Sequence, residues 1–357
     1  MKKLDLYIIK KFLGTYIFSI LLIIAIAVVF DINENLDKFL SKNAPVEAIA
    51  FDYYANFIPF FVNLFSPLFT FIAVIFFTSK LADNSEIIAM LSSGVSFRRL
   101  MRPYMFSAFI IASVNFVLSG YIIPEGNKDM IEFQNKYVKN KKQEYASNIQ
   151  LQVDSGVIAY IERYENPIKT GYRFSLEKFE GKQLKSRLTA QTAKYDTAYR
   201  WKLNDYLIRN FNGMKEEITK GASLDTIIEI EPQDFLISYG DEKQMINPKL
   251  SSYIDKQKMR GMGNIKDFEI EYERRFAMSM ASFILTIIGA SVSARKVKGG
   301  MGLNIGIGLG LSFGYILFMT VTSSFAVSGQ TSPRVAVWIP NIVFAIIALY
   351  LYRKAPN

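Results

Sequence analysis

The amino-acid sequence predicts an α-helical membrane protein with six transmembrane helices (3+3) and an inserted β-domain of the jelly-roll or sandwich type. Two observations lead to this fold class. Six long apolar runs gather towards the two ends of the 357-residue chain, and each is close to the ~20 residues that a helix needs to cross a ~30 Å hydrocarbon core. The polar block between them contains no such run, and much of it alternates in hydrophobicity with the period of two that is typical of strands.

The apolar runs set the expected positions of the helices. The first run is too long for the core of a signal peptide, and no small-x-small cleavage site follows it, so we expect it to remain as a helix. Three domains follow: residues 1–124 with three helices, residues 125–270 with the inserted domain and its connectors, and residues 271–357 with three more helices. The six spans are expected at roughly residues 12–30, 57–78, 104–123, 277–294, 303–327 and 335–352.

Lysine and arginine concentrate at alternate helix ends. The short loops on the side away from the N-terminus hold only Lys38, Lys42 and Arg334. By the positive-inside rule, both termini are therefore expected in the cytoplasm and the polar block outside. Arg274 and Arg275 oppose this pattern, but they adjoin a large translocated domain, where the rule is weak. The basic residues on the side of the N-terminus are Lys2, Lys3, Lys10, Lys11, Lys80, Arg98, Arg99, Arg102, Arg295, Lys296, Lys298, Arg353 and Lys354.

The composition excludes several classes of function. Much of the formal net charge of +10 belongs to the cytoplasmic helix ends, where it favours anionic lipid headgroups rather than nucleic acid. The chain has no cysteine and no histidine, which excludes disulfides, Zn sites built on those residues, a Ser-His-Asp triad and a histidine base. No G-x-x-x-x-G-K-[ST] phosphate loop occurs. No catalytic residue, metal site or bound cofactor is therefore predicted for this chain.

The inserted domain is expected to consist of seven or more short strands over residues 148–240. The segment "FEGKQLK" and the pair Asn212-Gly213 are typical of hairpin turns. Residues 125–145 are expected to extend the third helix into solvent, and residues 249–275 to return as helix into the fourth. Such a domain could be a passive cap, could accept acyl chains in an apolar cleft, or could add strands to a partner.

Four glycines recur at every fourth position of the predicted fifth helix. Gly302, Gly306, Gly310 and Gly314 lie in "GGMGLNIGIGLGLSFGYILF", and this spacing puts them on one helix face. A face without side chains lets another backbone approach closely. Two readings stay open, a static contact within the chain and a seam to a partner helix that opens and closes.

A short helix is predicted between the second and third spans, in "LADNSEIIAMLSSGVSFRRLMRP" at residues 81–103. Asp83 and Glu86 have the spacing of a capping box, and Gly94 lies where a helix would end. Between them Ile87, Met90, Leu91 and also Ile88 are expected to form an apolar stripe. The helix could lie on lipid headgroups, with Arg98, Arg99 and Arg102 binding anionic lipid, or could dock into a groove of a soluble partner.

The end of the first helix, "VVFDINENLDKFLSKN", carries charges at the outer interface. Lys38 and Lys42 could bind the phosphates of an anionic lipid there. The alternative is ordinary solvation of long side chains at a helix end.

The whole arrangement resembles the lipopolysaccharide-export permease family LptF/LptG (YjgP/YjgQ). The order of three spans, an outer β-domain and three spans is similar to that family, and the resemblance covers essentially all of the chain. The β-domain is recognised by its position. The segments that carry the resemblance are "LYIIKKFLGTY", "SEIIAMLSSGVSFRRL", "GGMGLNIGIGLGLSFGYIL" and "WIPNIVFAIIALYLYRK".

The resemblance implies a function and a set of partners. Two such permeases pair as a heterodimer in the inner membrane, driven by the separate cytoplasmic ATPase LptB, which uses the ATP. The short helix is then the coupling helix in the ATPase groove, with Glu86 matching its acidic residue. The first and fifth helices of the two permeases form lateral gates around a cavity for lipopolysaccharide. The periplasmic jelly rolls pass the lipid towards a periplasmic bridge, with LptC associated, and Lys38 and Lys42 approximately match the basic residues that contact lipid phosphates.

Two other functions compete with an ATP-driven exporter. An ion-coupled secondary lipid transporter usually needs ionisable residues at mid-membrane depth, and the predicted spans contain essentially none. A non-transporting anchor that uses the β-domain as a scaffold does not need a glycine seam.

Overall fold

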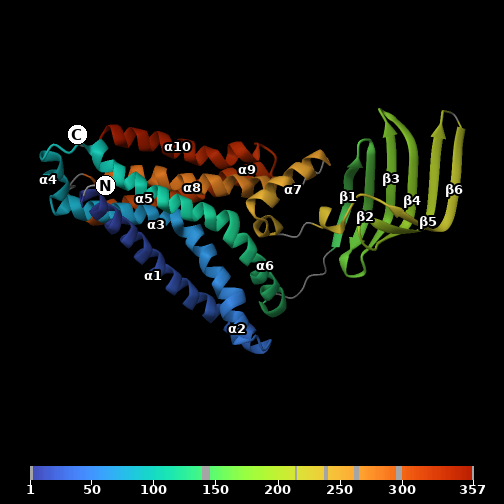
Figure 1. Cartoon of the computed structure of the whole chain (residues 1–357), viewed down its shortest axis with the longest axis horizontal. Helices are drawn as coiled ribbons and strands as arrows, with labels where there is room; N and C mark the ends of the chain where they lie inside the picture. Colours follow the sequence, from blue (N-terminus) through green and yellow to red (C-terminus); the bar gives the residue numbers. More distant parts are fainter. Residues whose placement is uncertain are drawn as a thin grey trace. The chain divides into compact units, whose positions relative to one another are not determined.

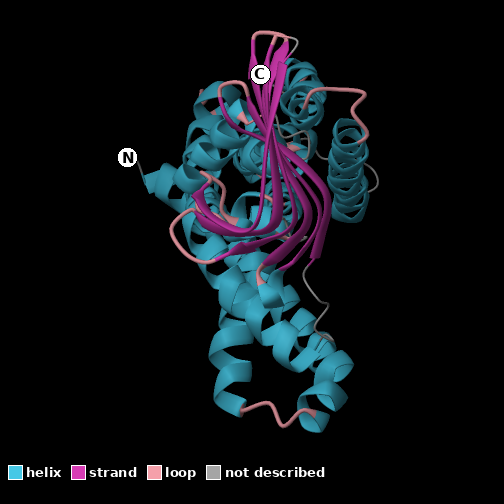
Figure 2. Ribbon diagram, turned by 90° about the vertical axis from the view of Figure 1, so that its right-hand side faces the viewer, coloured by secondary structure: helices cyan, strands magenta, loops and turns pink. Residues whose placement is uncertain are grey.

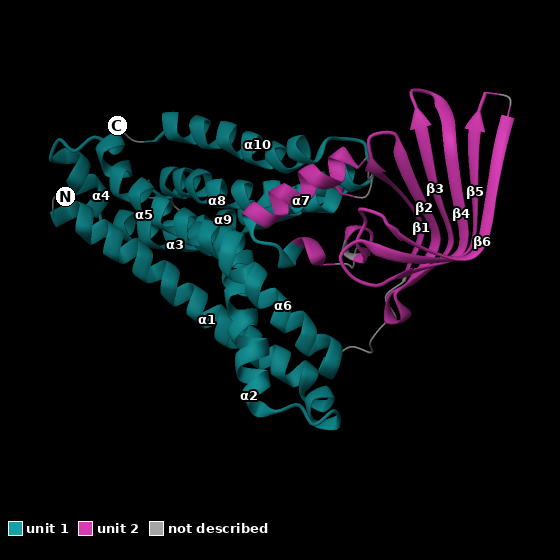
Figure 3. Cartoon of the chain, turned by 45° about the vertical axis from the view of Figure 1, so that its right-hand side comes forward, with its two compact units in different colours: residues 1–139, 243–247, 266–357 teal, residues 140–242, 248–265 magenta. Residues whose placement is uncertain are grey.

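The computed structural model of the chain describes residues 3–138, 145–213, 215–236, 240–260, 265–294 and 300–355. The chain divides into two compact units, which Figure 3 colours separately: residues 1–139, 243–247 and 266–357 form a helical unit, and residues 140–242 and 248–265 form a β unit. The connectors 125–139 and 266–270 therefore belong to the helical unit. Of the basic residues used to orient the chain, Lys2, Arg295, Lys296 and Lys298 lie outside the described residues.

The helical unit confirms the six predicted spans, which are long and apolar enough to cross a membrane. The first four spans extend well beyond their apolar runs at one or both ends, because polar residues there continue the helix, whereas the last two match theirs closely. The start of α1 and the end of α10 lie at the same end of this unit as the short helix α4 (Figure 1). The helices are α1 (Lys3–Ser41), α2 (Val46–Ala48), α3 (Ala55–Asp83), α4 (Glu86–Ser92), α5 (Phe97–Val117), α6 (Ile123–Phe133), α8 (Lys266–Ser293), α9 (Gly300–Val327) and α10 (Pro333–Arg353).

Wide helical turns join some of these helices into longer spans. Residues Leu118–Ile122 connect α5 to α6, and Gln134–Val138 continue α6, so one helical stretch runs from Phe97 to Val138. This confirms the predicted extension of the third helix as far as the structure describes it. Residues 139–144 lie outside the described residues.

Hydrogen bonds between side chains link the spans inside the apolar core. The hydroxyl of Tyr16 on α1 lies 2.6 Å from that of Ser66 on α3, and the amide of Asn115 on α5 donates to the same Ser66 oxygen at 2.6 Å. Asn304 on α9 donates to Ser79 at 3.0 Å. Because lipid is as apolar as the core, the hydrophobic effect does not drive membrane helices together. Hydrogen bonds of this kind and close packing hold them together instead.

The β unit confirms the inserted domain and its antiparallel strands. Its strands form one curved six-stranded sheet in which sequence neighbours are spatial neighbours (Figure 2). The prediction of seven or more short strands was wrong for the described residues, which form six strands of 9–13 residues. The strands are β1 (Tyr145–Asp154), β2 (Val157–Glu165), β3 (Thr170–Glu180), β4 (Gln183–Tyr195), β5 (Arg200–Asn212) and β6 (Lys215–Ile227).

Tight turns join each described strand to its neighbour in the sheet. The described strands therefore do not cross over to a second sheet, as those of a sandwich do. Gly181 links β3 to β4 and Gly213 links β5 to β6, both with positive φ, so both predicted hairpin turns are confirmed. The core of the unit gathers on one part of the sheet around Trp201, Phe174 and Tyr164. The segment after β6 covers it with Ile228, Ile230 and Phe235, and the indole of Trp201 donates to the carbonyl of Ile230 at 3.0 Å.

The return towards the fourth span is helical, as predicted, but it is interrupted. Helix α7 (Asn247–Met259) ends before α8 begins at Lys266. Residues 261–264 between them lie outside the described residues. Within the β unit, Asp234 fastens α7 and the residue after it to the segment that follows β6, because it accepts from Lys256 at 2.8 Å and forms an ion pair with Arg260.

Candidate functional site

Three features of the helical unit are candidates for function: the short helix α4, the outward faces of α1 and α9, and a pocket that contains two arginines. The first two were predicted from the sequence. The third was not.

The beginning of α4 differs from the prediction. Its N-cap is Ser85, which has a φ of 60° and makes no capping hydrogen bond through its side chain. The predicted capping box of Asp83 and Glu86 was wrong, because Asp83 is the last residue of α3 and keeps helical backbone instead of the extended backbone of an N-cap. The carboxylate of Glu86 accepts from the phenol of Tyr7 at 3.3 Å and from the amide of Asn84 at 3.2 Å.

The end of α4 confirms the predicted stop at Gly94. Gly94 has a φ of +87°, its N–H donates to the carbonyl of Leu91 at 3.0 Å, and the N–H of Val95 donates to the carbonyl of Met90 at 3.2 Å. This pair of bonds is a Schellman motif, which satisfies the last carbonyls of a helix and needs a residue with positive φ.

The apolar stripe of α4 faces the helical unit itself. Ile87 is completely buried, and Met90 and Leu91 pack against the same core, which contains Phe12 and Leu81. Ile88 lies on the opposite side and is 53% exposed. The stripe therefore holds α4 against the helical unit. Glu86 is half-buried and Ile88 is exposed, and they lie on different faces of α4, because residues two apart do not share a helix face.

The four spaced glycines of α9 make no contact within the described chain. A Cβ added at Gly302, Gly306, Gly310 or Gly314 would meet no atom within 4 Å. Two other glycines show the contrast: a Cβ at Gly308 would lie 2.4 Å from Ile75, and one at Gly289 would lie 2.9 Å from Val74. Of the two open readings, a static contact within the chain is thus not observed among the described residues.

The first span is exposed in the same way. The apolar window of α1 is 22% buried and that of α9 is 28% buried, the two lowest values among the six spans. Phe18, Leu21 and Phe30 of α1 and Leu317 of α9 are more than half exposed. Within a bilayer such faces contact lipid or another chain.

Lys38, at the end of α1, lies in a polar network rather than in a pocket. Lys38 donates to Asn35 at 2.9 Å, and Asn35 donates to Asp31 at 3.2 Å. Asp31 also accepts from Tyr53 at 3.1 Å and from Tyr54 at 2.9 Å. Lys42 is exposed just beyond the end of α1. The structure does not bring either lysine into the cavity described next.

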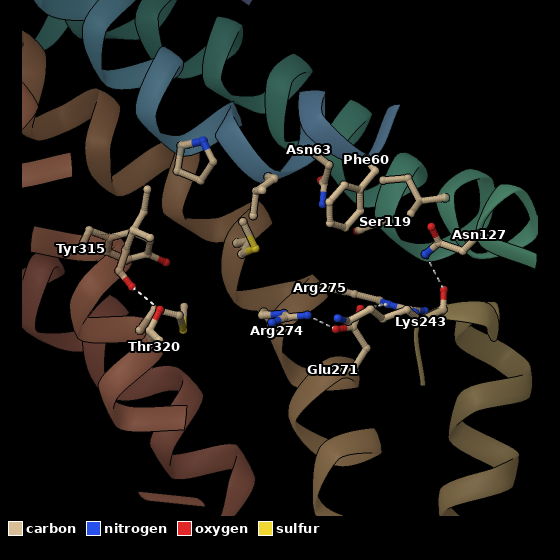
Figure 4. Close-up of a pocket in the computed structure, with 16 residues that line it drawn as sticks. Phe60, Asn63, Ser119, Asn127, Lys243, Glu271, Arg274, Arg275, Tyr315 and Thr320 are labelled. Atoms are coloured by element: carbon tan, nitrogen blue, oxygen red, sulfur yellow. Dashed lines mark hydrogen bonds and ion pairs between the residues drawn. The ribbon is translucent and has the colours of Figure 1, made fainter. Parts of the chain in front are cut away.

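A cavity of about 240 Å³ lies among α3, α6, α8 and α9 (Figure 4). Its polar end holds three cations and one carboxylate, so the lining carries a formal excess of two positive charges. Its other walls are mainly apolar. The lining residues are Phe60, Asn63, Leu64, Pro67, Ser119, Ile123, Asn127, Lys243, Glu271, Arg274, Arg275, Met278, Tyr315, Ile316, Met319 and Thr320.

The two arginines of this cavity have different environments. Arg275 is 2% exposed and donates to Glu271 at 3.1 Å, to the carbonyl of Met245 at 2.8 Å and to Asn247 at 2.9 Å. Arg274 also pairs with Glu271, but its side chain keeps 38% of its surface exposed. Arg275 is therefore a structural residue that fastens the segment 243–247, whereas Arg274 offers its guanidinium to the cavity.

A charged end beside apolar walls fits an amphipathic anion such as a phosphorylated lipid. Sequence reasoning noted Arg274 and Arg275 only as exceptions to the charge bias. Their position beside an apolar span, on the side where basic residues are scarce, was the signal that could have identified them.

Comparison with known families and proteins adds one finding. The family model described as "Lipopolysaccharide export system permease LptF/LptG" matches residues 6–354. The comparison with curated proteins finds no match.

Proposed function

Because the chain belongs to the lipopolysaccharide export permease family LptF/LptG, we propose that it is the transmembrane subunit of an ATP-driven exporter in the bacterial inner membrane. This subunit extracts lipopolysaccharide from the membrane and passes it to a periplasmic bridge. The observation that carries the proposal is the family match over residues 6–354, together with six spans around an inserted β-domain.

In this proposal the energy comes from a separate subunit. The sequence contains no phosphate-binding loop, so ATP is hydrolysed by a cytoplasmic ATPase of the LptB type, and this chain binds no cofactor itself. Helix α4 is the contact with that ATPase. Ile87, Met90 and Leu91 hold the helix against the permease, and Gly94 ends it. Glu86 and Ile88 lie at the two edges of this stripe and contact the partner from either side.

The coupling between α4 and the transport path runs through α1. The hydrogen bond from Tyr7 to Glu86 joins the start of the first span to the start of α4. A movement of α4 in the ATPase groove would therefore displace the start of α1 directly.

The exposed faces of α1 and α9 support a seam with a paralogous permease. The smooth glycine face of Gly302, Gly306, Gly310 and Gly314 allows a partner helix to approach closely without hydrogen bonds between side chains. A seam of this kind can open sideways for a lipid. The pairing is with the LptF or LptG counterpart of this chain.

The lipid path then leads towards the outer side. Arg274 and Lys243 of the cavity, with Lys38 and Lys42 near the end of α1, supply positive charge for phosphate groups. The β unit stands on the periplasmic side in this proposal and passes the lipid on with LptC. Both chain ends are cytoplasmic, as the bias of basic residues indicates.

Affinity purification of the full chain from native membranes tests the proposal. We expect an ATPase, a second permease and lipopolysaccharide to copurify with it. Recovery of lipopolysaccharide transport by the purified chain alone, driven by an ion gradient, would contradict the ATP-driven mechanism and favour a secondary transporter.

Two variants of Glu86 test the role of α4 in the same assay. Glu86→Lys reverses the charge and is expected to abolish ATPase association, whereas Glu86→Gln removes the charge and can still accept from Tyr7. A Glu86→Lys variant with unchanged ATPase coupling would eliminate the assigned role of this residue. Ile88→Ala removes an exposed apolar side chain from another face of α4 and tests for a contact that does not depend on charge.

A further inference from the structure

A groove that is separate from the cavity described above lies among α5, α8 and α10. Its volume is about 770 Å³, and it opens at the end of the helical unit where α5 begins and α10 ends. Arg98 and Arg102 of α5 stand at this end. Residues four apart lie on one face of a helix, so both guanidinium groups border the same opening.

The walls of the groove below the arginines are apolar. Met105 continues the face of α5, Ile287 comes from α8, and Ala345 and Leu349 come from α10. None of the described residues that line the groove is acidic. From Arg98 to Phe106 the groove follows α5 over eight residue steps, or about 12 Å at 1.5 Å per residue.

No carboxylate in the described part of the chain pairs with Arg98 or Arg102. Among the described residues neither side chain has an ion pair or a hydrogen bond with a carboxylate, whereas Arg99 between them is paired with Asp5. Both are exposed. Arginine presents a planar group that binds phosphate with two parallel hydrogen bonds, so two such groups at one opening form a strong site for a phosphate.

The apolar walls alone would not select a ligand in a membrane, because lipid chains are as apolar as the groove. The arginines therefore decide which lipid binds, and the groove orders its acyl chain. A zwitterionic headgroup brings a cation next to the arginines, whereas an anionic headgroup does not.

We propose that this groove is a binding site for one anionic phospholipid of the adjacent leaflet. Its phosphate lies between Arg98 and Arg102, and one acyl chain runs along Met105, Ile287 and Leu349. The site is separate from the export path and does not rest on the proposed function. The bound lipid fills the space among α5, α8 and α10. It lies beside the first turns of α5, which follow α4 in the sequence.

The test uses the purified full chain in nanodiscs that contain phosphatidylglycerol and phosphatidylcholine in equal amounts. Native mass spectrometry after mild release counts the lipids that stay bound. For the wild type we expect retained phosphatidylglycerol to exceed phosphatidylcholine about tenfold, the effect of 1.4 kcal/mol at 25 °C. Added inorganic phosphate at millimolar concentration should leave the bound lipid in place, since a free phosphate lacks the acyl chain.

Matched variants separate the effect of the two arginines on lipid binding from the effect of positive charge in general. Arg98→Gln with Arg102→Gln should abolish the preference, whereas Lys10→Gln with Lys11→Gln, which removes two exposed charges at the same end of the spans, should keep it. Equal loss in both double variants would overturn the proposal in favour of a diffuse surface attraction. Gel filtration and thermal unfolding confirm that each variant is folded.

A second pair of variants tests the groove. Ala345→Trp fills the groove and should lower the retained phosphatidylglycerol severalfold, whereas Ile346→Trp adds the same side chain at a neighbouring exposed position and should not. No effect of Ala345→Trp would show that only the headgroup binds and would overturn the groove site. Loss of a copurifying protein, rather than of lipid, in the arginine double variant would instead make this face a protein interface.

Discussion

Arg99 at the start of α5 forms a bidentate ion pair with Asp5 at the start of α1. The Nη1–Oδ1 distance is 2.7 Å and the Nη2–Oδ2 distance is 2.8 Å, across 94 positions of sequence. The side chain of Asp5 keeps only 10% of its surface exposed. Paired hydrogen bonds between ionised groups are roughly twice as strong as neutral ones, so this contact fixes the beginning of the first span against the third.

Removing either partner of this pair is expected to lower the thermal stability of the full chain in detergent. Arg99→Gln leaves a largely buried carboxylate without its bidentate partner, and Asp5→Asn leaves the arginine without its anion. The double variant should lose less stability than the two single variants together, because both single variants remove the same interaction. Strictly additive losses in a double-mutant cycle would contradict the coupling.

The glycines of α8 and α9 predict opposite effects of the same substitution. Gly289→Leu forces a side chain against Val74 and Phe71 and should destabilise the chain by about 1–3 kcal/mol, the usual cost of overpacking. A Cβ at Gly306 meets no described atom within 4 Å, so Gly306→Leu should leave the stability nearly unchanged while weakening association with a second permease. Thermal unfolding and copurification measure the two effects. Unimpaired association of Gly306→Leu would argue against the seam.

Asp234 makes the β unit sensitive to acid. Burial raises the pKa of Asp234, but hydrogen bonds from Arg260 and Lys256 more than offset this and leave the pKa below its ordinary value of 3.8. A carboxyl whose pKa is lower in the folded state stabilises that state above the unfolded pKa. This stability is lost as the pH falls below about 4 and through the folded pKa.

The fluorescence of Trp201 can follow this loss. Trp201 lies in the core of the β unit, and the sequence has only one other tryptophan, Trp338, so Trp338→Phe isolates the signal. In that background Asp234→Asn should destabilise the β unit by about 2 kcal/mol at pH 7, as expected for lost hydrogen bonds between charged groups. The variant should also show a smaller loss of stability on acidification. If Asp234→Asn loses as much stability on acidification as its parent, other carboxyl groups cause the loss.

Arg274 and Arg275 are expected to differ although they are neighbours. Arg275→Gln breaks buried bonds to Met245 and Asn247 and should lower the unfolding temperature. Arg274→Gln should leave the unfolding temperature nearly unchanged and reduce photo-crosslinking to lipopolysaccharide severalfold. Unreduced crosslinking in Arg274→Gln would exclude this cavity from the lipid path.

Local patterns were sufficient for the elements themselves. The apolar runs predicted six spans because only a helix satisfies its own backbone in hydrocarbon. The period of two predicted the inserted strands, and the glycines at 94, 181 and 213 predicted where a helix or strand ends. Each of these depends on residues close together in the sequence.

What covers a given face depends on parts of the chain far away, and the tertiary structure decided it. Periodicity placed Ile87, Met90 and Leu91 on one stripe, but only the fold turned that stripe towards Phe12 and Leu81 of the chain's own core. The same holds for the glycine face of α9, which points away from the chain, and for Arg274 in its cavity. The sequence therefore determined which residues share a face, while packing across more than 90 positions, as between Asp5 and Arg99, determined which faces remain open to lipid or a partner.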